Sequence, residues 1–257
     1  MAWPEPRTIL ITGASGSIGS ALAREYAADG RRLVLQGRNE AKLSSVAKRC
    51  EARGAQVFTA CLDLTDVEGA RTWMRSLWQT HEPDLVVLNA GMNTDIGPGR
   101  HGEDWADSQK LVQLNLMGVM ALAELVGREM RSRGGGQLAL VSSLAGYFGL
   151  PVTPSYCASK AGIKAYGEAL RGWLGPEGVK VSVIMPGYVS SPMCEAMPGP
   201  KPFLMRPERA ARIIRRGLAR NRARISFPFP LNLGTWFLAV LPAAFSTRLV
   251  GWMGYRG

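Results

Sequence analysis

The stretch Arg7-Thr-Ile-Leu-Ile-Thr12 runs directly into Gly13-Ala-Ser-Gly16-Ser-Ile-Gly19, and this junction decides the fold class. The apolar run predicts a buried strand, and a helix is expected from about residue 18 to residue 29. A strand, a glycine loop and a helix N-terminus in this order present backbone N–H groups and a positive dipole end to a pyrophosphate. The spacing Gly-x-x-Gly-x-x-Gly differs from the usual Gly-x-Gly-x-x-Gly, so a tight turn without a ligand is the alternative. The flanking strand and helix favour phosphate binding.

The rest of the chain repeats this alternation of strand and helix. Further strands are predicted at 32–36, 55–62, 84–89, 137–141 and 180–185, with a last one starting at Ile225. The helices between them are predicted at 40–53, 67–79, 105–131, 155–174 and 207–220. Such alternation implies right-handed crossovers and an α/β, doubly wound, mostly parallel sheet with helices on both faces, a Rossmann fold. Residues 1–228 are predicted to form this dinucleotide-binding and catalytic domain, and residues 229–257 a hydrophobic C-terminal segment.

Composition narrows the class of protein. The chain has 257 residues, of which 46% are hydrophobic, as expected for one large globular domain. The net charge is +11, but eight arginines lie between positions 206 and 224, opposed there only by Glu208. No aromatic residues interleave them, which argues against nucleic-acid binding. The four cysteines have no paired or metal-ligand spacing, so we expect no metal site and a reducing, cytoplasmic compartment.

The chemistry of the chain is concentrated between Ser142 and Lys160. The predicted strand 137–141 delivers Ser142 and Ser143 at its C-terminal end, and the next helix carries Tyr156 and Lys160 on one face. A lysine ammonium beside a phenol lowers the tyrosine pKa from its usual value of about 10. Such a tyrosine can exchange a proton with a substrate oxygen, and a serine hydroxyl can hydrogen-bond the same atom. Tyr-x-x-x-Lys alone is common, however, and also fits a solvated helix face.

The end of the second predicted strand indicates the cofactor. A dinucleotide enzyme that prefers NAD needs a carboxylate here for the ribose 2′-hydroxyl. This chain has Gly37-Arg38-Asn39 instead. An arginine suits a 2′-phosphate as a bidentate, permanently charged partner. We therefore expect NADP(H) to be preferred, with NAD(H) possible, although Arg38 also fits a surface arginine at a strand end.

Together these motifs resemble the short-chain dehydrogenase/reductase family, in its compact single-domain branch, over about residues 7–227. The signals are, in order, the 12–19 loop, Asp63, Asn89-Ala90-Gly91, Asn115, Ser143, Tyr156-Cys-Ala-Ser-Lys160 and Pro186-Gly187-Tyr-Val-Ser-Ser191. Ser17 departs from the glycine usual in this branch. The glycine spacing instead matches the extended branch, which contains nucleotide-sugar epimerases and dehydratases. That branch has a larger C-terminal domain than the residues after Pro186 can form.

The resemblance implies a role for each matching residue. Tyr156 would be the general acid/base and Ser143 would polarise the carbonyl. Lys160 would lower the Tyr156 pKa and hold the nicotinamide ribose, while Asn115 would support a proton-relay water. The implied cofactor-binding residues are Gly13, Ser15, Gly16, Ser17, Ile18, Gly19, Arg38, Asp63, Leu64, Asn89, Ala90, Gly91, Tyr156, Lys160, Pro186, Gly187, Val189 and Ser191.

The C-terminal part has two segments of interest. Residues 188–206, rich in Met, Pro and Phe, resemble the family's substrate lid, and methionine adapts to varied apolar shapes. Residues 225–247 carry no charge, but their prolines argue against a straight membrane-spanning helix. One interpretation is a segment lying in an anionic membrane surface on its cytoplasmic side. The other is a cover over the pocket or a subunit contact, in a homodimer or homotetramer.

The sequence thus predicts an NADP(H)-dependent oxidoreductase that interconverts a ketone or aldehyde and an alcohol on a small lipophilic substrate. One alternative is a nucleotide-sugar-modifying enzyme related to the epimerase/dehydratase branch. Another is a non-catalytic, cofactor-binding sensor. The intact set of Ser143, Tyr156 and Lys160 weighs against the sensor, because losing any one of them would remove catalysis without removing binding.

Overall fold

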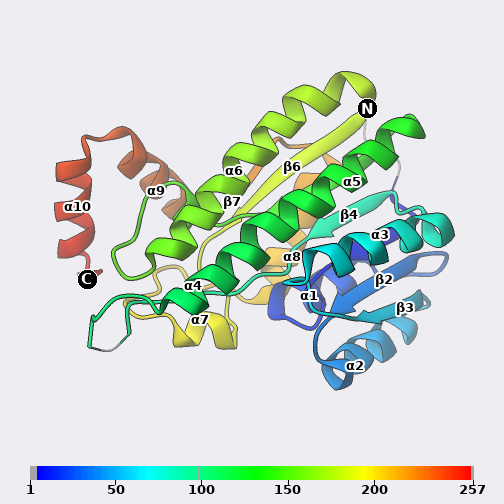
Figure 1. Cartoon of the computed structure of the whole chain (residues 1–257), viewed down its shortest axis with the longest axis horizontal. Helices are drawn as coiled ribbons and strands as arrows, with labels where there is room; N and C mark the ends of the chain where they lie inside the picture. Colours follow the sequence, from blue (N-terminus) through cyan, green and yellow to red (C-terminus); the bar gives the residue numbers. More distant parts are fainter. Residues whose placement is uncertain (1–4, 98, 256–257) are drawn as a thin grey trace.

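The computed structural model describes residues 5–97 and 99–255, and a seven-stranded parallel sheet forms its centre (Figure 1). The ends of the two predicted segments, residues 1–4 and 256–257, lie outside the described residues. Every neighbouring pair of strands is parallel, in the order β3-β2-β1-β4-β5-β6-β7, so the order reverses between β1 and β4. This confirms the predicted doubly wound α/β fold. The strands are β1 (Thr8–Ile11), β2 (Arg32–Gly37), β3 (Gln56–Cys61), β4 (Leu85–Leu88), β5 (Gly136–Val141), β6 (Val179–Pro186) and β7 (Arg224–Phe227).

Helices cover both faces of the sheet because successive strand residues point to opposite sides. Along β1, Ile9 and Ile11 pack in one hydrophobic core and Leu10 packs in the other. The first core is closed by α1 (Ser17–Tyr26), α2 (Glu40–Glu51) and α8 (Pro207–Ala219). The second is closed by α3 (Val67–His81), α5 (Val119–Ser132) and α6 (Pro154–Leu174). The carboxyl ends of all seven strands therefore remain as the edge where a ligand can bind.

The helix predicted over residues 105–131 is interrupted by a π-helical turn. It comprises α4 (Trp105–Val112), the π-turn η1 (Gln113–Gly118) and α5. By length and composition the whole stretch could cross a membrane, but 56% of its most apolar window is buried inside the protein, so it is a core helix. Single π-turns inside α-helices are frequent at functional sites. This one contains Asn115.

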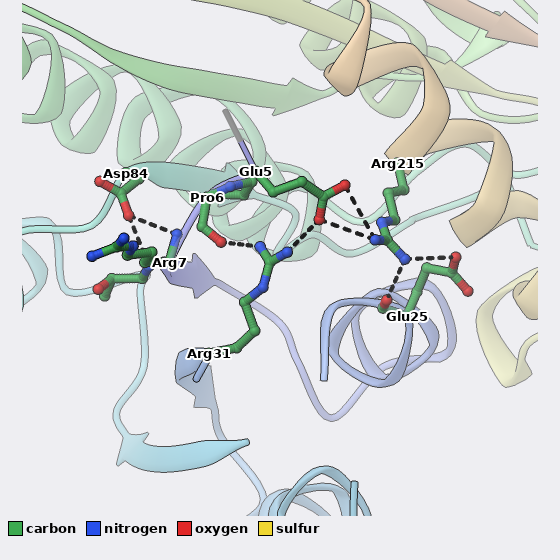
Figure 2. Close-up of polar contacts among 8 residues, drawn as sticks. Glu5, Pro6, Arg7, Glu25, Arg31, Asp84 and Arg215 are labelled. Carbon is green, nitrogen blue, oxygen red and sulfur yellow. Dashed lines mark hydrogen bonds and ion pairs between the residues drawn. The ribbon is translucent and has the colours of Figure 1, made fainter. Parts of the chain in front are cut away.

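Hydrogen bonds and ion pairs of charged side chains stabilise the amino-terminal edge of the sheet (Figure 2). Asp84 accepts a hydrogen bond from the Arg7 backbone N–H at 2.8 Å. Arg215 of α8 pairs with Glu5 at 3.1 Å and with Glu25 of α1 at 3.5 Å. Arg215 is therefore partly buried and ties α8 to α1.

The C-terminal segment forms two short helices, α9 (Leu231–Val240) and α10 (Ala243–Trp252), which lie to the left of the sheet in Figure 1. Pro242 separates them, since proline cannot continue a helix interior. Leu238, Val250 and Tyr255 form a small hydrophobic core with Val152, from the loop between β5 and α6. The segment 188–206 contains α7 (Pro192–Ala196) and closes on itself, as Met205 N donates to Tyr188 O at 2.9 Å.

Candidate active site

The glycine loop after β1 is packed so closely that two of its positions need glycine. Gly13 has a φ of +64°, and a Cβ there would lie 2.8 Å from the Cα of Ala90. A Cβ on Gly19 would lie 2.4 Å from the Gly13 carbonyl oxygen. At Gly16 a Cβ would meet only that same oxygen, at 3.3 Å, so the constraint there is weaker. The tight turn brings the start of α1 up to the end of β4.

The N-terminus of α1 is open to a ligand. Gly16 is its N-cap, no side chain among the described residues caps it, and its first turn contains no acidic residue. Ser15, Ser17 and Ile18 line the adjoining cavity. Uncapped N–H groups at the positive end of a helix dipole bind phosphate well. This arrangement suits the pyrophosphate of a dinucleotide.

Two amide side chains hold the glycine loop in shape. Gln36, only 1% exposed, accepts a hydrogen bond from Gly13 N at 3.1 Å and donates one to Leu62 O at 2.8 Å. Asn89 Nδ2 donates to Thr12 O at 2.9 Å. Gln36 is not among the residues proposed from the sequence. Nothing in the sequence pattern signals its role, because both partners are distant along the chain.

Positive side chains border the cavity beyond the end of β2. The Arg38 side chain is 54% exposed, and its Nη1 lies 3.8 Å from Asp63 Oδ2. Partial burial alone would raise the pKa of Asp63, but hydrogen bonds from Thr65 and the charges of Arg38 and Lys110 lower it overall. Arg38, Lys42 and Lys160 line the cavity, and no carboxylate among the described residues does so. The cavity therefore favours an anionic ligand.

Asn115 is buried beside the end of β4. Its Oδ1 accepts from Met92 N at 2.9 Å, and its Nδ2 donates to Met92 O at 2.8 Å and to Ser159 Oγ at 3.3 Å. A Cβ on Gly91 would lie 3.1 Å from Asn115 Oδ1 and 3.4 Å from Lys160 Nζ. The π-turn thus joins the chain after β4 to helix α6.

Ser143, Tyr156 and Lys160 come together at the carboxyl end of β5. Ser143 hydrogen-bonds Tyr156 and accepts from Ala145 N at 3.1 Å. Lys160 Nζ donates to Val141 O at 3.0 Å and lies 5.6 Å from the centroid of the Tyr156 ring. All three side chains line the cavity. A hydroxyl, a phenol and a buried amine can therefore reach one bound group.

Burial shifts two pKa values in this cluster. Burial raises the pKa of Tyr156 to about 12, and the hydrogen bond from Ser143 offsets this only in part. Burial also lowers the pKa of Lys160 to about 8. Without cofactor, burial therefore dominates the pKa of Tyr156 and also disfavours the charge of Lys160, so the role expected of Lys160 toward the Tyr156 pKa stays a prediction. Tyr156 consequently keeps its proton at neutral pH.

Lys160→Met is expected to stabilise the cofactor-free protein at pH 7, with a gain in the free energy of unfolding of about 1–3 kcal/mol. The folded-state pKa of Lys160, about 8, lies below the unfolded value of about 10.4. The loss of folding stability that Lys160 causes is therefore complete below about pH 8, and it disappears as the pH rises through about 10.4. Urea unfolding at pH 7 and near pH 10 measures the difference. The exposed Lys48 of α2 supplies a matched control, Lys48→Met, and a Lys160→Met protein less stable than wild type at both pH values would contradict the expectation.

A single cavity of 520 Å³ connects these parts. Of the residues proposed from the sequence, all line it except Gly19, Asp63 and Asn115. Each of the three lies next to a residue that does line the cavity, namely Gly13, Arg38 and Gly91 respectively.

The end of the cavity away from the glycine loop is formed largely by the segment 188–206 and the C-terminal segment, together with residues soon after Ser143 that the sequence did not single out. We call this end the substrate chamber; its lining includes Leu144, Phe148, Leu150, Tyr188, Met193, Met197, Leu231, Thr235, Leu238, Val250, Met253 and Tyr255. Half of these residues belong to the C-terminal segment. The uncharged run 225–247 was the available signal, but it fitted a membrane contact equally well.

A doubly wound parallel sheet, a phosphate-binding loop at its switch point and a Ser–Tyr–Lys cluster on the same edge define a dinucleotide-dependent oxidoreductase. The similarity of this chain to known proteins supports this class. A family model described as short chain dehydrogenase matches residues 7–199. An uncharacterised oxidoreductase of Myxococcus xanthus is 35% identical over 94% of this chain and 95% of its own.

Solved structures show the same fold. A short-chain dehydrogenase from Sphingobium yanoikuyae in complex with NADPH superposes with a TM-score of 0.79 at 24% identity, covering 95% of this chain and 92% of the other. A protein described as an NAD(P)-dependent gluconate 5-dehydrogenase from Beutenbergia cavernae, with bound NADP, has a TM-score of 0.76 at 25% identity and covers 86% and 93%. The chain belongs to the short-chain dehydrogenase family and is an oxidoreductase.

Proposed function

We propose that this protein is an NADP(H)-dependent enzyme that interconverts a ketone or aldehyde and an alcohol on a lipophilic substrate. One observation carries the proposal: Ser143, Tyr156 and Lys160 line a cavity that has a phosphate-binding loop at one end and an apolar chamber at the other. A cofactor and a carbonyl compound can therefore meet beside a proton donor. The apolar lining supports a lipophilic substrate over a nucleotide sugar.

The residues present fit a phosphorylated dinucleotide. A side chain at Gly13 or Gly19 would collide with backbone atoms, so glycine is needed at both positions for a tight loop whose backbone a ligand can approach closely. The uncapped α1 accepts the pyrophosphate, and Arg38 with Lys42 suits a 2′-phosphate. NADP(H) is thus the preferred cofactor, NAD(H) remaining usable, and the NADP bound to the Beutenbergia protein supports this choice. When bound, NADPH supplies the hydride that reduces the carbonyl carbon.

The chain's own residues orient the carbonyl and move the proton. Ser143 donates a hydrogen bond to the carbonyl oxygen, and Tyr156 donates its phenolic proton to the same atom. Lys160 stabilises the phenolate that remains and holds the nicotinamide ribose. Asn115 positions the chain around Met92 and supports the water that returns a proton to the site. Because burial raises the pKa of Tyr156 to about 12, the phenol carries at neutral pH the proton that reduction of a carbonyl consumes.

The test of this function is NADPH consumption by the purified protein with a panel of carbonyl compounds. Ketones of increasing apolar size and acyl-chain ketones are compared with nucleotide sugars of similar volume. We expect kcat/KM to rise with the apolar area of the ketone until the chamber is filled. Turnover of the nucleotide sugars alone would overturn the proposal, and NADPH binding without turnover of any compound would indicate a sensor.

The outer surface of the C-terminal helices supports a membrane contact. Apolar side chains that do not face the chamber are exposed there: Phe229, Leu233, Trp236, Phe237, Val240, Phe245, Leu249 and Trp252. The only charged residue between 225 and 255 is Arg248. Exposed apolar surface of this extent on α9 and α10 marks an interaction site. The enzyme is proposed to bind the cytoplasmic face of an anionic membrane through these helices and to take its substrate from there.

Liposome flotation checks this contact. Replacing Trp236 and Trp252 with serine is expected to abolish most flotation with anionic vesicles, because interfacial binding scales with the apolar area inserted. Trp173→Ser, which removes an exposed tryptophan from α6, is the matched control. Light scattering on the same variants tests the homodimer or homotetramer. If the wild type never floats, and if the same substitutions dissociate its oligomer, this face is a subunit contact instead.

A further inference from the structure

Two tyrosines that line the largely apolar substrate chamber are hydrogen-bonded to each other through their hydroxyl groups. Tyr188 follows β6, and Tyr255 lies near the chain end, so the two come from segments far apart in the sequence. Their hydroxyl oxygens are 2.8 Å apart. Tyr255 is only 5% exposed and Tyr188 is half-buried, and both line the chamber. None of the steps proposed above uses either hydroxyl.

The hydrogens of this pair can be assigned by counting donors. Tyr255 donates its single hydroxyl hydrogen to the carbonyl oxygen of Pro200, which is an acceptor only. The hydrogen between the two tyrosines must therefore come from Tyr188 and be accepted by Tyr255. The Tyr188 oxygen is left with acceptor lone pairs and no hydrogen to give. Burial raises the pKa of both phenols, so each keeps its proton at working pH.

The other hydroxyl in the chamber is committed in the same way. Thr235 Oγ1 donates within its own helix, to Leu231 O at 3.0 Å. Around these groups the wall is formed by Phe148, Leu150 and Leu238, which have no polar side-chain atoms. Away from Ser143 and Tyr156, the described hydroxyl groups of the chamber thus offer acceptors and no free donor.

We propose that the chamber selects carbonyl substrates carrying a hydrogen-bond donor, a hydroxyl or an amide N–H, on the apolar part remote from the reacting carbonyl, and that Tyr188 accepts this hydrogen bond. The inference rests on the proposed function, since it assigns the far end of the same substrate. Tyr188 is a specificity-determining residue that touches the substrate. Tyr255 is a positioning residue, because it accepts the hydrogen bond that Tyr188 donates and so leaves the Tyr188 oxygen free only to accept.

Matched ketones test the assignment. A series of equal chain length ends in hydroxyl, which donates and accepts, in methoxy, which only accepts, or in methyl, which does neither. For the wild type with NADPH, kcat/KM of the hydroxy ketone is expected to exceed that of the methyl ketone by about threefold to tenfold, the net value of one neutral hydrogen bond. Chain length is varied so that the terminal group can reach Tyr188.

The variants separate the two roles. Tyr188→Phe abolishes the preference for hydroxyl over methyl. Tyr255→Phe frees the Tyr188 hydrogen, so the methoxy ketone gains about threefold to tenfold relative to the methyl ketone, a change that mere loosening of the chamber would not produce. Tyr166→Phe in helix α6, which removes a hydroxyl that donates to Met120 O of α5, keeps wild-type ratios.

A binding measurement distinguishes the inference from the function beneath it. The same ketones are titrated calorimetrically into the complex of the Tyr156→Phe protein with NADPH, where no turnover is required. A hydroxyl preference in Kd that Tyr188→Phe removes supports the inference even if no ketone is reduced by the wild type. Equal Kd and equal kcat/KM across the series, at every chain length that the wild type reduces, overturn the inference while leaving the proposed function intact.

Discussion

Replacing Tyr156 with phenylalanine is expected to lower kcat at least about 100-fold and up to about 10,000-fold, the range that a positioned general acid contributes. The substitution removes the phenolic proton and leaves the ring, which packs beside Lys160. The glycine loop and the cations around Arg38 are untouched, so the Kd for NADPH should stay close to that of the wild type. Single-turnover reduction of the best ketone from the panel, together with an NADPH titration, measures both quantities.

Tyr166→Phe is the matched control for this variant, because it removes a phenolic hydroxyl from the same helix, at a position that does not line the cavity. Its kcat should equal the wild-type value. If Tyr156→Phe retained wild-type turnover, the proton would have to come from another group, and the assignment of Tyr156 would fail. If it lost NADPH binding as well, the loss of turnover would no longer report proton transfer.

Arg38→Ala is expected to weaken NADPH binding about 10- to 100-fold, which corresponds to the roughly 1.5–3 kcal/mol of hydrogen bonds to a charged group. The Arg38 side chain is half exposed and lies 3.8 Å from Asp63, so the pair is loose enough for the guanidinium to turn to a 2′-phosphate. NADH has no such phosphate, and its Kd should change much less. Titration of both cofactors into both proteins measures the selectivity.

Lys48→Ala controls for the loss of one positive charge, since Lys48 is exposed on α2 and does not line the cavity. Lys42→Ala tests the other exposed cation of the cavity. It should lower the affinity for NADPH less than Arg38→Ala does, because an ammonium is a point charge without the bidentate geometry of arginine. Equal affinities of the wild type for NADPH and NADH would refute the role of Arg38.

The sequence alone determined the fold class and the order of the site along the chain. The fully buried β1 reads as a continuous apolar run, and a strand buried on both faces is the signature of a parallel sheet covered by helices. Alternation of such strands with helices then places the glycine loop, Asn89, Ser143 and Pro186 at one edge, because all strands run in the same direction. These inferences depend on local patterns, which the sequence displays directly.

The tertiary structure decided what depends on distant neighbours and on burial. Gln36 shapes the glycine loop through partners at Gly13 and Leu62, and no spacing rule predicts that contact. Burial raises the pKa of Tyr156, and this desolvation cannot be foreseen before the cavity wall exists. The uncharged C-terminal run fitted several partners equally well, since hydrophobicity has no direction. Only the packing of Leu238, Val250 and Tyr255 against Val152 shows that one side of this segment closes the substrate chamber, leaving its other side exposed.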